Sequence, residues 1–199
     1  MSQHEGYTGL VKTSEGVKRP RVRPVEFEQT TGEARKAFEK GLARFGRLTN
    51  MKRTLLHCPP AYQALMEWYT LFEIVKGFLG ERLAIIFSHV ISTESDCLIC
   101  TTFMRRILIE WGEKPDELNL DEKGEAIVAF GCALAHQGNR VPDEVYARAA
   151  RFFNDEQMVA LTAFGALMIA TNIINNVLQV DLDEYLYAYR KAPSPIERG

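Results

Sequence analysis

Apolar residues recur at helical spacing in one segment after another from residue 33 onward. In the first segment Ala34, Phe38, Leu42 and Phe45 share one face, because side chains three or four positions apart lie on the same side of a helix. Segment 81–92 is so densely apolar that it fits a helix or a strand, and we interpret it as a helix because its neighbours are helical. The sequence therefore predicts an all-α fold of about seven to nine helices, in the segments 32–48, 59–80, 81–92, 97–112, 120–138, 141–153, 154–180 and 181–191.

Several residues indicate where these helices begin and end. Gly80 and Gly112 follow apolar segments, which is typical of glycine at the carboxyl end of a helix. Asn154 precedes two acidic residues and is a favourable N-cap. Ser95 or Asp96 is expected to cap the helix that contains two neighbouring cysteines.

The totals are those of an ordinary globular chain. A length of 199 residues favours one domain that can bury a core without disulfide bonds. The net charge of −2 gives no general attraction to nucleic acid or anionic lipid. We see no secretory signal, and the apolar run 163–170 is too short to span a membrane. We expect a cytoplasmic protein with no nucleic-acid or membrane partner and, because there is no glycine-rich phosphate loop, no cofactor.

Residues 1–30 differ from the rest of the chain because they are polar and lack helical periodicity. Pro20 and Pro24 lie among four basic residues and disfavour a helix. Four charges without interleaved aromatic residues are too few for a nucleic-acid-binding arm. We predict an extended arm over 1–30, packed on its own body or on a neighbouring subunit, and a single all-α domain over 31–199.

The pattern SDCLICTTFMRR, residues 95–106, places two residues between Cys97 and Cys100. At the start of a helix the backbone N–H groups and the helix dipole stabilise a thiolate and lower the pKa of a thiol. The spacing lets the two sulfurs form a disulfide, so a redox pair is one interpretation. A zinc site is disfavoured because it needs four ligands and no second such pair is present. Two cysteines packed in the core are an equally good alternative.

The segment SDCLICTTFMRRILIEWG resembles the signature helix of the carboxymuconolactone decarboxylase superfamily, in its alkyl hydroperoxidase D-like branch. In that signature a histidine follows the second cysteine by four positions, and the helix ends at a glycine. Cys97, Cys100 and Gly112 match it. The segments 55–92 and 141–178 are similar to the helices that precede and follow the signature. The resemblance implies an all-α domain that assembles as a dimer, trimer or hexamer.

The resemblance also implies roles for the two cysteines. In peroxidase members the second cysteine attacks a hydroperoxide, the first resolves the product, and a histidine and a glutamate relay the proton. Carried over by position, Cys100 is the nucleophile and Cys97 the resolving thiol. The histidine position holds Met104, which cannot accept a proton from a thiol. The glutamate position holds Ile85 in an ungapped alignment, and a shifted alignment places Glu81 near it.

His89 is the first residue that we consider as a substitute base, because it lies in the preceding helix on the same face as Ile85; a buried core histidine is the alternative. The resemblance implies a slow thiol peroxidase or disulfide reductase that uses a hydroperoxide and an external dithiol. A decarboxylase of the same superfamily and a non-enzymatic redox-sensing or scaffolding oligomer are the alternatives. A homo-oligomer is also expected because 158–178 is more apolar than one buried stripe requires.

Overall fold

The computed structural model describes residues 20–136 and 140–191. All regular structure within these ranges is helical, as the sequence predicts, and it comprises nine α-helices and two 3-10 helices. In chain order these are η1 (Phe27–Gln29), α1 (Gly32–Phe45), α2 (Asn50–Leu55), α3 (Pro59–Met66), α4 (Trp68–Leu79), α5 (Glu81–Glu94), α6 (Leu98–Glu110), α7 (Glu122–Ala135), α8 (Asp143–Ala150), α9 (Asp155–Leu178) and η2 (Glu184–Tyr189).

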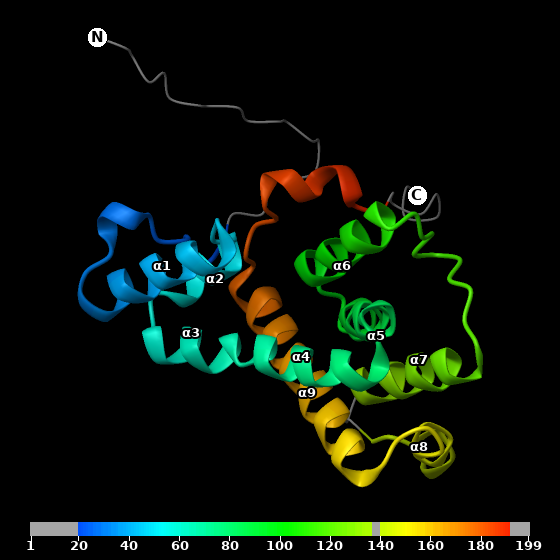
Figure 1. Cartoon of the computed structure of the whole chain (residues 1–199). Coiled ribbons are helices and arrows are strands. Elements are labelled where there is room, and N and C mark those ends of the chain that lie inside the picture. Colours follow the sequence, from blue (N-terminus) through cyan, green and yellow to red (C-terminus); the bar gives the residue numbers. More distant parts are fainter. Residues whose placement is uncertain (1–19, 137–139, 192–199) are drawn as a thin grey trace.

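Helix α5 forms the centre of the fold, and α4, α6, α7 and α9 pack around it (Figure 1). Ala84, Ile86, Phe87 and Ile91 have no exposed surface. A helix that is apolar on all sides is stable in water only when other elements cover it on all sides. Its central position therefore explains why segment 81–92 lacks a polar face, and the interpretation as a helix is confirmed.

Helix α9 places residues that are distant in the sequence next to the start of α6. It begins at Asn154, whose side chain accepts from the backbone N–H of Gln157 while the Gln157 side chain accepts from the backbone N–H of Asn154. At Gly165 a Cβ would contact the side chain of Leu134 and lie 3.2 Å from Phe87. The missing side chain lets α9 approach α5 and α7 closely, so that its carboxyl-terminal half runs beside the α5–α6 turn.

By length and composition alone, α9 could cross a membrane. In the fold it packs against α4, α5 and α7, which is the environment of a core helix. Val159, Ile173 and Val177 on α9 remain more than half exposed. These exposed side chains agree with the expectation that this helix meets a partner, but the homo-oligomer and the cytoplasmic location stay predictions.

A second, smaller apolar cluster joins α1, α2 and α3 to the segment 20–30. In that segment the backbone N–H of Arg21 donates to the carbonyl of Leu178 at the end of α9. The segment 20–30 thus packs against helices of the same chain, which is one of the two arrangements expected for the arm. It is not fully extended, because it includes the short helix η1. The rest of the predicted arm, residues 1–19, lies outside the described residues.

Two helical predictions need correction. The segment 59–80 is not one helix, because it breaks at Glu67 into α3 and α4. The last segment, 181–191, forms the 3-10 helix η2 rather than an α-helix, and only Leu186 in η2 is buried. Gly80 and Gly112 do follow helices, with φ angles of 85° and 79° that suit glycine.

Candidate active site

The turn between α5 and α6 places Cys97 at the start of a helix. Ser95 is the C-cap of α5, and Asp96 has a positive φ of 48°. Cys97 itself, rather than Ser95 or Asp96 as predicted, is the N-cap of α6. The correction has a local cause: the left-handed conformation of Asp96 reverses the chain within two residues, so the helix begins later. The carbonyl of Cys97 accepts the first bond of the new helix, from the backbone N–H of Thr101.

Both thiols are buried, and no disulfide joins them. Cys97 is 1% exposed and Cys100 is 7% exposed. The side-chain amide of Asn175, on α9, lies 3.3 Å from Cys100 Sγ and 3.8 Å from Cys97 Sγ, and donates to both. The neighbouring Asn176 donates to the carbonyl of Ser95 and so fixes the turn to the same helix. Three elements therefore converge on the cysteine pair: the α5–α6 turn, the first turn of α6 and the end of α9.

The two thiols have opposite pKa shifts. The pKa of Cys97 is lowered, first by a hydrogen bond from the Cys100 thiol and further by the backbone N–H groups of Cys100 and Ile99 and by Asn175, against the effect of burial. The pKa of Cys100 is raised well above its ordinary value, because its proton is held in the bond to Cys97 and because it is buried beside a negative sulfur. The expectation that both pKa values fall therefore holds for Cys97 alone.

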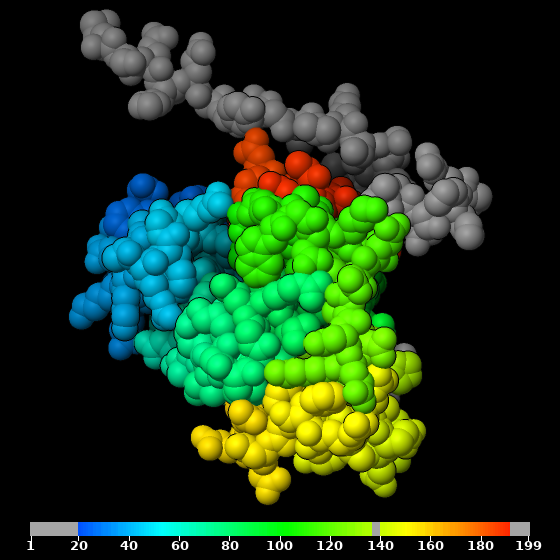
Figure 2. All heavy atoms as spheres, turned by 45° about the vertical axis from the view of Figure 1, so that its right-hand side comes forward, coloured from blue at the N-terminus to red at the C-terminus, as the bar shows by residue number. Residues whose placement is uncertain are grey.

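An apolar pocket of about 110 Å³ lies against Cys100. Cys100 lines it, and Cys97 does not. The pocket lies between α2 and α3 on one side and α6 on the other, and the corresponding cyan and green surfaces border each other in Figure 2. The apolar part of the wall is rich in aromatic and thioether side chains: Met51, Leu65, Met66, Trp68, Ile99, Phe103, Met104, Met168 and Leu186.

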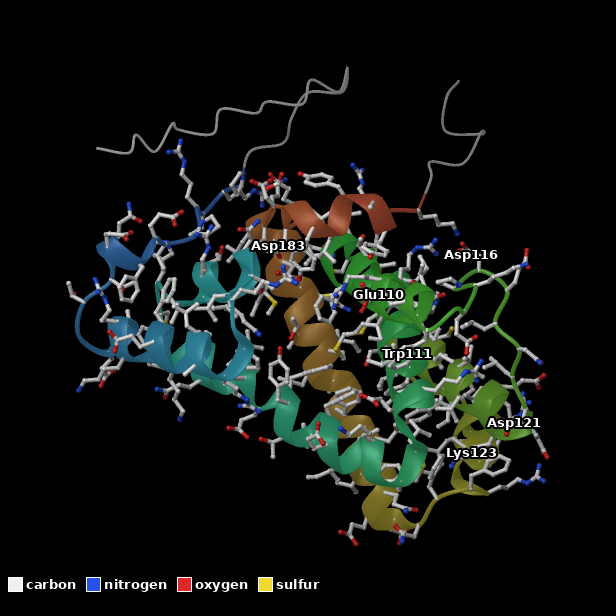
Figure 3. The ribbon with its side chains drawn as sticks, turned by 45° about the horizontal axis from the view of Figure 1, so that its top comes forward. Glu110, Trp111, Asp116, Asp121, Lys123 and Asp183 are labelled. Carbon is white, nitrogen blue, oxygen red and sulfur yellow. The ribbon has the colours of Figure 1, made fainter. Side chains whose placement is uncertain are left out.

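Polar side chains also reach the pocket wall, among them Lys52 and Asp183. The pKa of Lys52 is lowered to about 8, first by burial and then by the positive charge of Arg44. Burial raises the pKa of Asp183, whose Oδ1 accepts from the backbone N–H of Asn50 at 2.9 Å. In Figure 3 Asp183 lies beside the end of α9, and Glu110 and Trp111 lie at the carboxyl end of α6.

Neither His89 nor Glu81 forms a hydrogen bond with the two thiols. Among the described residues, the hydrogen-bond partners of the two sulfurs are each other, Asn175 and backbone N–H groups of α6. Glu81 is exposed at the first position of the 14-residue helix α5, about 20 Å from its other end. It was therefore wrong to place Glu81 near the pair, because α5 is continuous and holds it at the far end.

His89 is a buried core residue, 8% exposed. Its pKa is lowered to about 4, first by burial and next by the positive charge of Arg105. A ring with a pKa of about 4 is a weak base at pH 7, and its hydrogen bond is to the backbone of Thr101 rather than to either sulfur. The alternative that was considered for His89, a core histidine, describes it better than a catalytic role does.

The remaining cysteines do not extend the site. Cys58 is exposed. The pKa of Cys132 is raised to about 11, first by burial and then by the charge of Glu94, which also accepts a hydrogen bond from the thiol. Within the described ranges no group of three His, Cys, Asp or Glu side chains could hold a metal ion.

Sequence reasoning missed Asn175 and Lys52. The cluster of asparagines at 172, 175 and 176 in an otherwise apolar helix is the signal that could have drawn attention to Asn175, since polar side chains in a core helix need partners. Lys52 carries no such signal, because α2 has only six residues and shows no clear periodicity.

Comparison of the fold with solved structures gives clear matches. The AhpD core protein of Ralstonia eutropha JMP134, described as an uncharacterized peroxidase-related protein, is 17% identical, with a TM-score of 0.70 over 88% of this chain and 98% of that one. This chain has the alkylhydroperoxidase AhpD-like fold. The expectation from the signature helix is thus confirmed for the fold, while no family model and no curated protein matches the sequence.

A second relative with the AhpD-like fold is the debrominase Bmp8. Its apo structure is 17% identical to this chain, with a TM-score of 0.67 over 84% of this chain and 95% of that one. A cysteine-to-alanine variant of Bmp8 in complex with 2,3,4-tribromopyrrole matches with a TM-score of 0.68, also at 17% identity, over 84% of this chain and 94% of that one. At this level of identity the likeness concerns the fold, so the chemistry of this chain has to be argued from its own residues.

Proposed function

We propose that this chain is a thiol-dependent oxidoreductase in which Cys97 and Cys100 together deliver two electrons to a substrate in the adjoining pocket. The observation that carries the proposal is a pair of buried, hydrogen-bonded thiols of which one, Cys100, lines an apolar pocket. Cysteines that only fill a core need neither a lowered pKa nor access to a pocket. The AhpD-like fold of a peroxidase-related protein adds support.

Cys100 is the attacking thiol because it lines the pocket. The lowered pKa of Cys97 and the raised pKa of Cys100 make Cys97 the thiol of the pair that loses its proton more readily. As Cys100 attacks, its proton passes along the existing hydrogen bond to Cys97, so the pair supplies its own base. This arrangement takes the place of a relay histidine, whose position holds the buried Met104.

The leading substrate class is a hydroperoxide. The sulfur of Cys100 attacks the terminal oxygen, the O–O bond breaks, and the departing alkoxide takes a proton from water to leave as an alcohol. The product on Cys100 is a sulfenic acid. The thiol of Cys97 then attacks the sulfenic sulfur, water leaves, and a disulfide joins the two residues. An external dithiol takes up the oxidation and returns both thiols.

Reductive dehalogenation is the second candidate, and the aromatic and methionine-rich wall of the pocket favours it. The fold similarity to the debrominase Bmp8 also favours it. In this reaction the sulfur of Cys100 takes the bromine of an aryl bromide, and the ring carbon takes a proton. Cys97 then displaces bromide and forms the same disulfide, so the same two electrons are delivered.

Counting thiols tests the proposal. In a Cys58→Ser/Cys132→Ser background, the two remaining thiols should both disappear on addition of cumene hydroperoxide, and a dithiol should restore them. A parallel reaction with 2,3,4-tribromopyrrole should release bromide with the same loss of thiols if dehalogenation is the activity. Thiols that stay reduced with both compounds would contradict the proposal and leave a scaffold with inert cysteines.

A further inference from the structure

Lys52 is a buried ammonium at the wall of the Cys100 pocket. The residue is 5% exposed, and its Nζ lies 3.3 Å from the centre of the Phe45 ring and 4.9 Å from that of Tyr69. Such contacts with ring faces stabilise a cation that has lost part of its water. Burial of a lysine is costly unless its charge is compensated. The rings compensate the charge only in part, because the pKa of Lys52 is lowered to about 8.

Within the described part of the chain no carboxylate lies within 4.0 Å of the Lys52 ammonium. Asp183 acts on it only at longer range, and one Asp183 oxygen already accepts from Asn50. The positive charges of Arg47 and Arg53 also act on Asp183. Arg53 is itself paired with Glu26 at 2.7 Å. Arg44 adds a positive charge near Lys52 and Asp183 is the carboxylate that acts on it from a distance, so the ammonium retains capacity for an anionic partner.

The rest of the pocket fits a flat apolar group. Its volume of about 110 Å³ is of the order of the ~150 Å³ cavity that holds a benzene ring in another protein. Trp68, Phe103 and Met104 offer ring faces and thioether contacts. Cys100 opens on the same space. A ligand that contacts the aromatic wall, the Lys52 ammonium and Cys100 at once has one ring, one negatively charged oxygen, and a reacting bond near the sulfur.

We propose that the Cys100 pocket binds a single-ring aromatic anion, a phenolate or an aryl carboxylate, with its charged oxygen on Lys52 and its ring against Trp68 and Met104. This inference rests on the proposed function, since it names the substrate class of the same site. Lys52 is then a specificity residue: it selects anions among small aromatic compounds, whereas the thiols perform the redox step.

Binding can be measured through Trp68 without any redox reaction. The chain has two tryptophans, and Trp111→Phe leaves Trp68 as the fluorophore in the pocket. The probes are 4-nitrobenzoate and its neutral counterpart nitrobenzene, both of which quench tryptophan. In the Trp111→Phe background, Lys52→Met should lower the affinity for 4-nitrobenzoate at least tenfold, because a hydrogen bond to a charged group is lost. The affinity for nitrobenzene should change less than threefold.

Lys123→Met is the matched control. The Lys123 ammonium also lies over a ring, that of Phe153 at 5.0 Å, but it does not line the pocket. This variant should bind both probes as the parent does. Equal losses of both probes in Lys52→Met would overturn the inference, because Lys52 would then only shape the pocket. Failure of both probes to bind the parent would overturn it as well.

A second measurement needs no variant at position 52. The titratable groups that act on Lys52 are Arg44 and Asp183, and its pKa of about 8 lies within the accessible range. Because 4-nitrobenzoate stays charged, its affinity should be constant below pH 7 and fall about tenfold between pH 7 and pH 9, as Lys52 loses its proton. Nitrobenzene should show no such fall, and a flat profile for both probes would contradict the inference.

Different results would contradict the redox function and the proposed substrate class. If the thiols are oxidised by hydroperoxide but 4-nitrobenzoate does not bind, the redox function stands and the substrate class is wrong. If 4-nitrobenzoate binds through Lys52 while the thiols remain inert to hydroperoxide and aryl bromide, the pocket is a ligand site and the redox function is wrong.

Discussion

The side-chain amide of Asn175 donates to Cys100 Sγ over 3.3 Å, from a position 75 residues further along the chain. The same nitrogen reaches Cys97 Sγ at 3.8 Å. A donor aimed at two sulfurs favours the state in which the pair carries a negative charge. Helix α9 therefore contributes to the chemistry of a motif that lies entirely in the α5–α6 segment.

Replacing Asn175 with Ala should raise the pKa of Cys97, since a hydrogen bond to the charged thiolate is lost. The rate of alkylation by iodoacetamide at pH 7 should fall by up to about tenfold, and its pH profile should move to higher pH. Asn176→Ala is the control, because Asn176 donates to the Ser95 carbonyl and not to a sulfur. The same profile in Asn175→Ala and the parent would refute the role of the amide.

Met104→His should speed hydroperoxide reduction. Met104 is buried one turn after Cys100 and lines the same pocket, so a histidine there lies within reach of the attacking thiol. Proton transfer by a positioned side chain typically contributes ~10²–10⁴ in rate, and we expect at least about tenfold in a site not built for it. Met104→Leu keeps the volume without a base and should leave the rate within about twofold. A histidine variant no faster than Met104→Leu would contradict this prediction.

His89 should make stability depend on pH. Its pKa is about 4 in the folded chain and ordinarily 6.5. Between these values the unfolded chain binds a proton that the folded chain does not, so the free energy of unfolding rises with pH from 4 to 6.5. On acidification from pH 7 to pH 4 the parent should lose about 3 kcal/mol more than His89→Gln, measured by urea denaturation. Parallel losses in the two proteins would show that His89 does not titrate in this way.

The exposed apolar face of α9 predicts a homo-oligomer. Ile173 and Val177 are 54% and 53% exposed and one turn apart. Light scattering at micromolar concentration should give a multiple of the 22.6 kDa chain mass. Ile173→Asp should shift the mass towards that of one chain, because a charge at an apolar interface is costly, whereas the exposed Ile74→Asp on α4 serves as control. A parent protein that scatters as a single chain would rule out the oligomer.

The sequence was sufficient to predict the helical fold because its signals are local. Asn154 does cap α9, and Gly80 and Gly112 do follow α4 and α6, since these residues suit the backbone at helix ends. The break at Glu67 escaped prediction because the apolar pattern continues through it. The 3-10 geometry of η2 was not predicted either, because the spacing of its tyrosines fits a 3-10 helix and an α-helix alike.

The site was predictable only in part, because it is assembled from segments far apart in the chain. The pair of Cys97 and Cys100 is visible as a motif, but the contact from Asn175 and the pocket wall at Lys52 depend on how α9 and α2 pack against α6. His89 and Glu81 were chosen by their positions along the sequence. Burial and the charge of Arg105 lower the pKa of His89 to about 4, which makes it a weak base, and the length of α5 keeps Glu81 away from the thiols.

The central claim is that Cys100 attacks a pocket-bound substrate and Cys97 resolves the product. The most direct measurement is mass spectrometry of peptides after one equivalent of cumene hydroperoxide, in the presence of a sulfenic-acid trap. Cys97→Ser should form the sulfenic acid on Cys100 more slowly, because the base is lost, but should keep it in the trapped form, because the resolving thiol is absent. Cys100→Ser should remain unmodified at Cys97 and show no peroxidase turnover. A trapped sulfenic acid on Cys97, or full turnover in Cys100→Ser, would contradict this account.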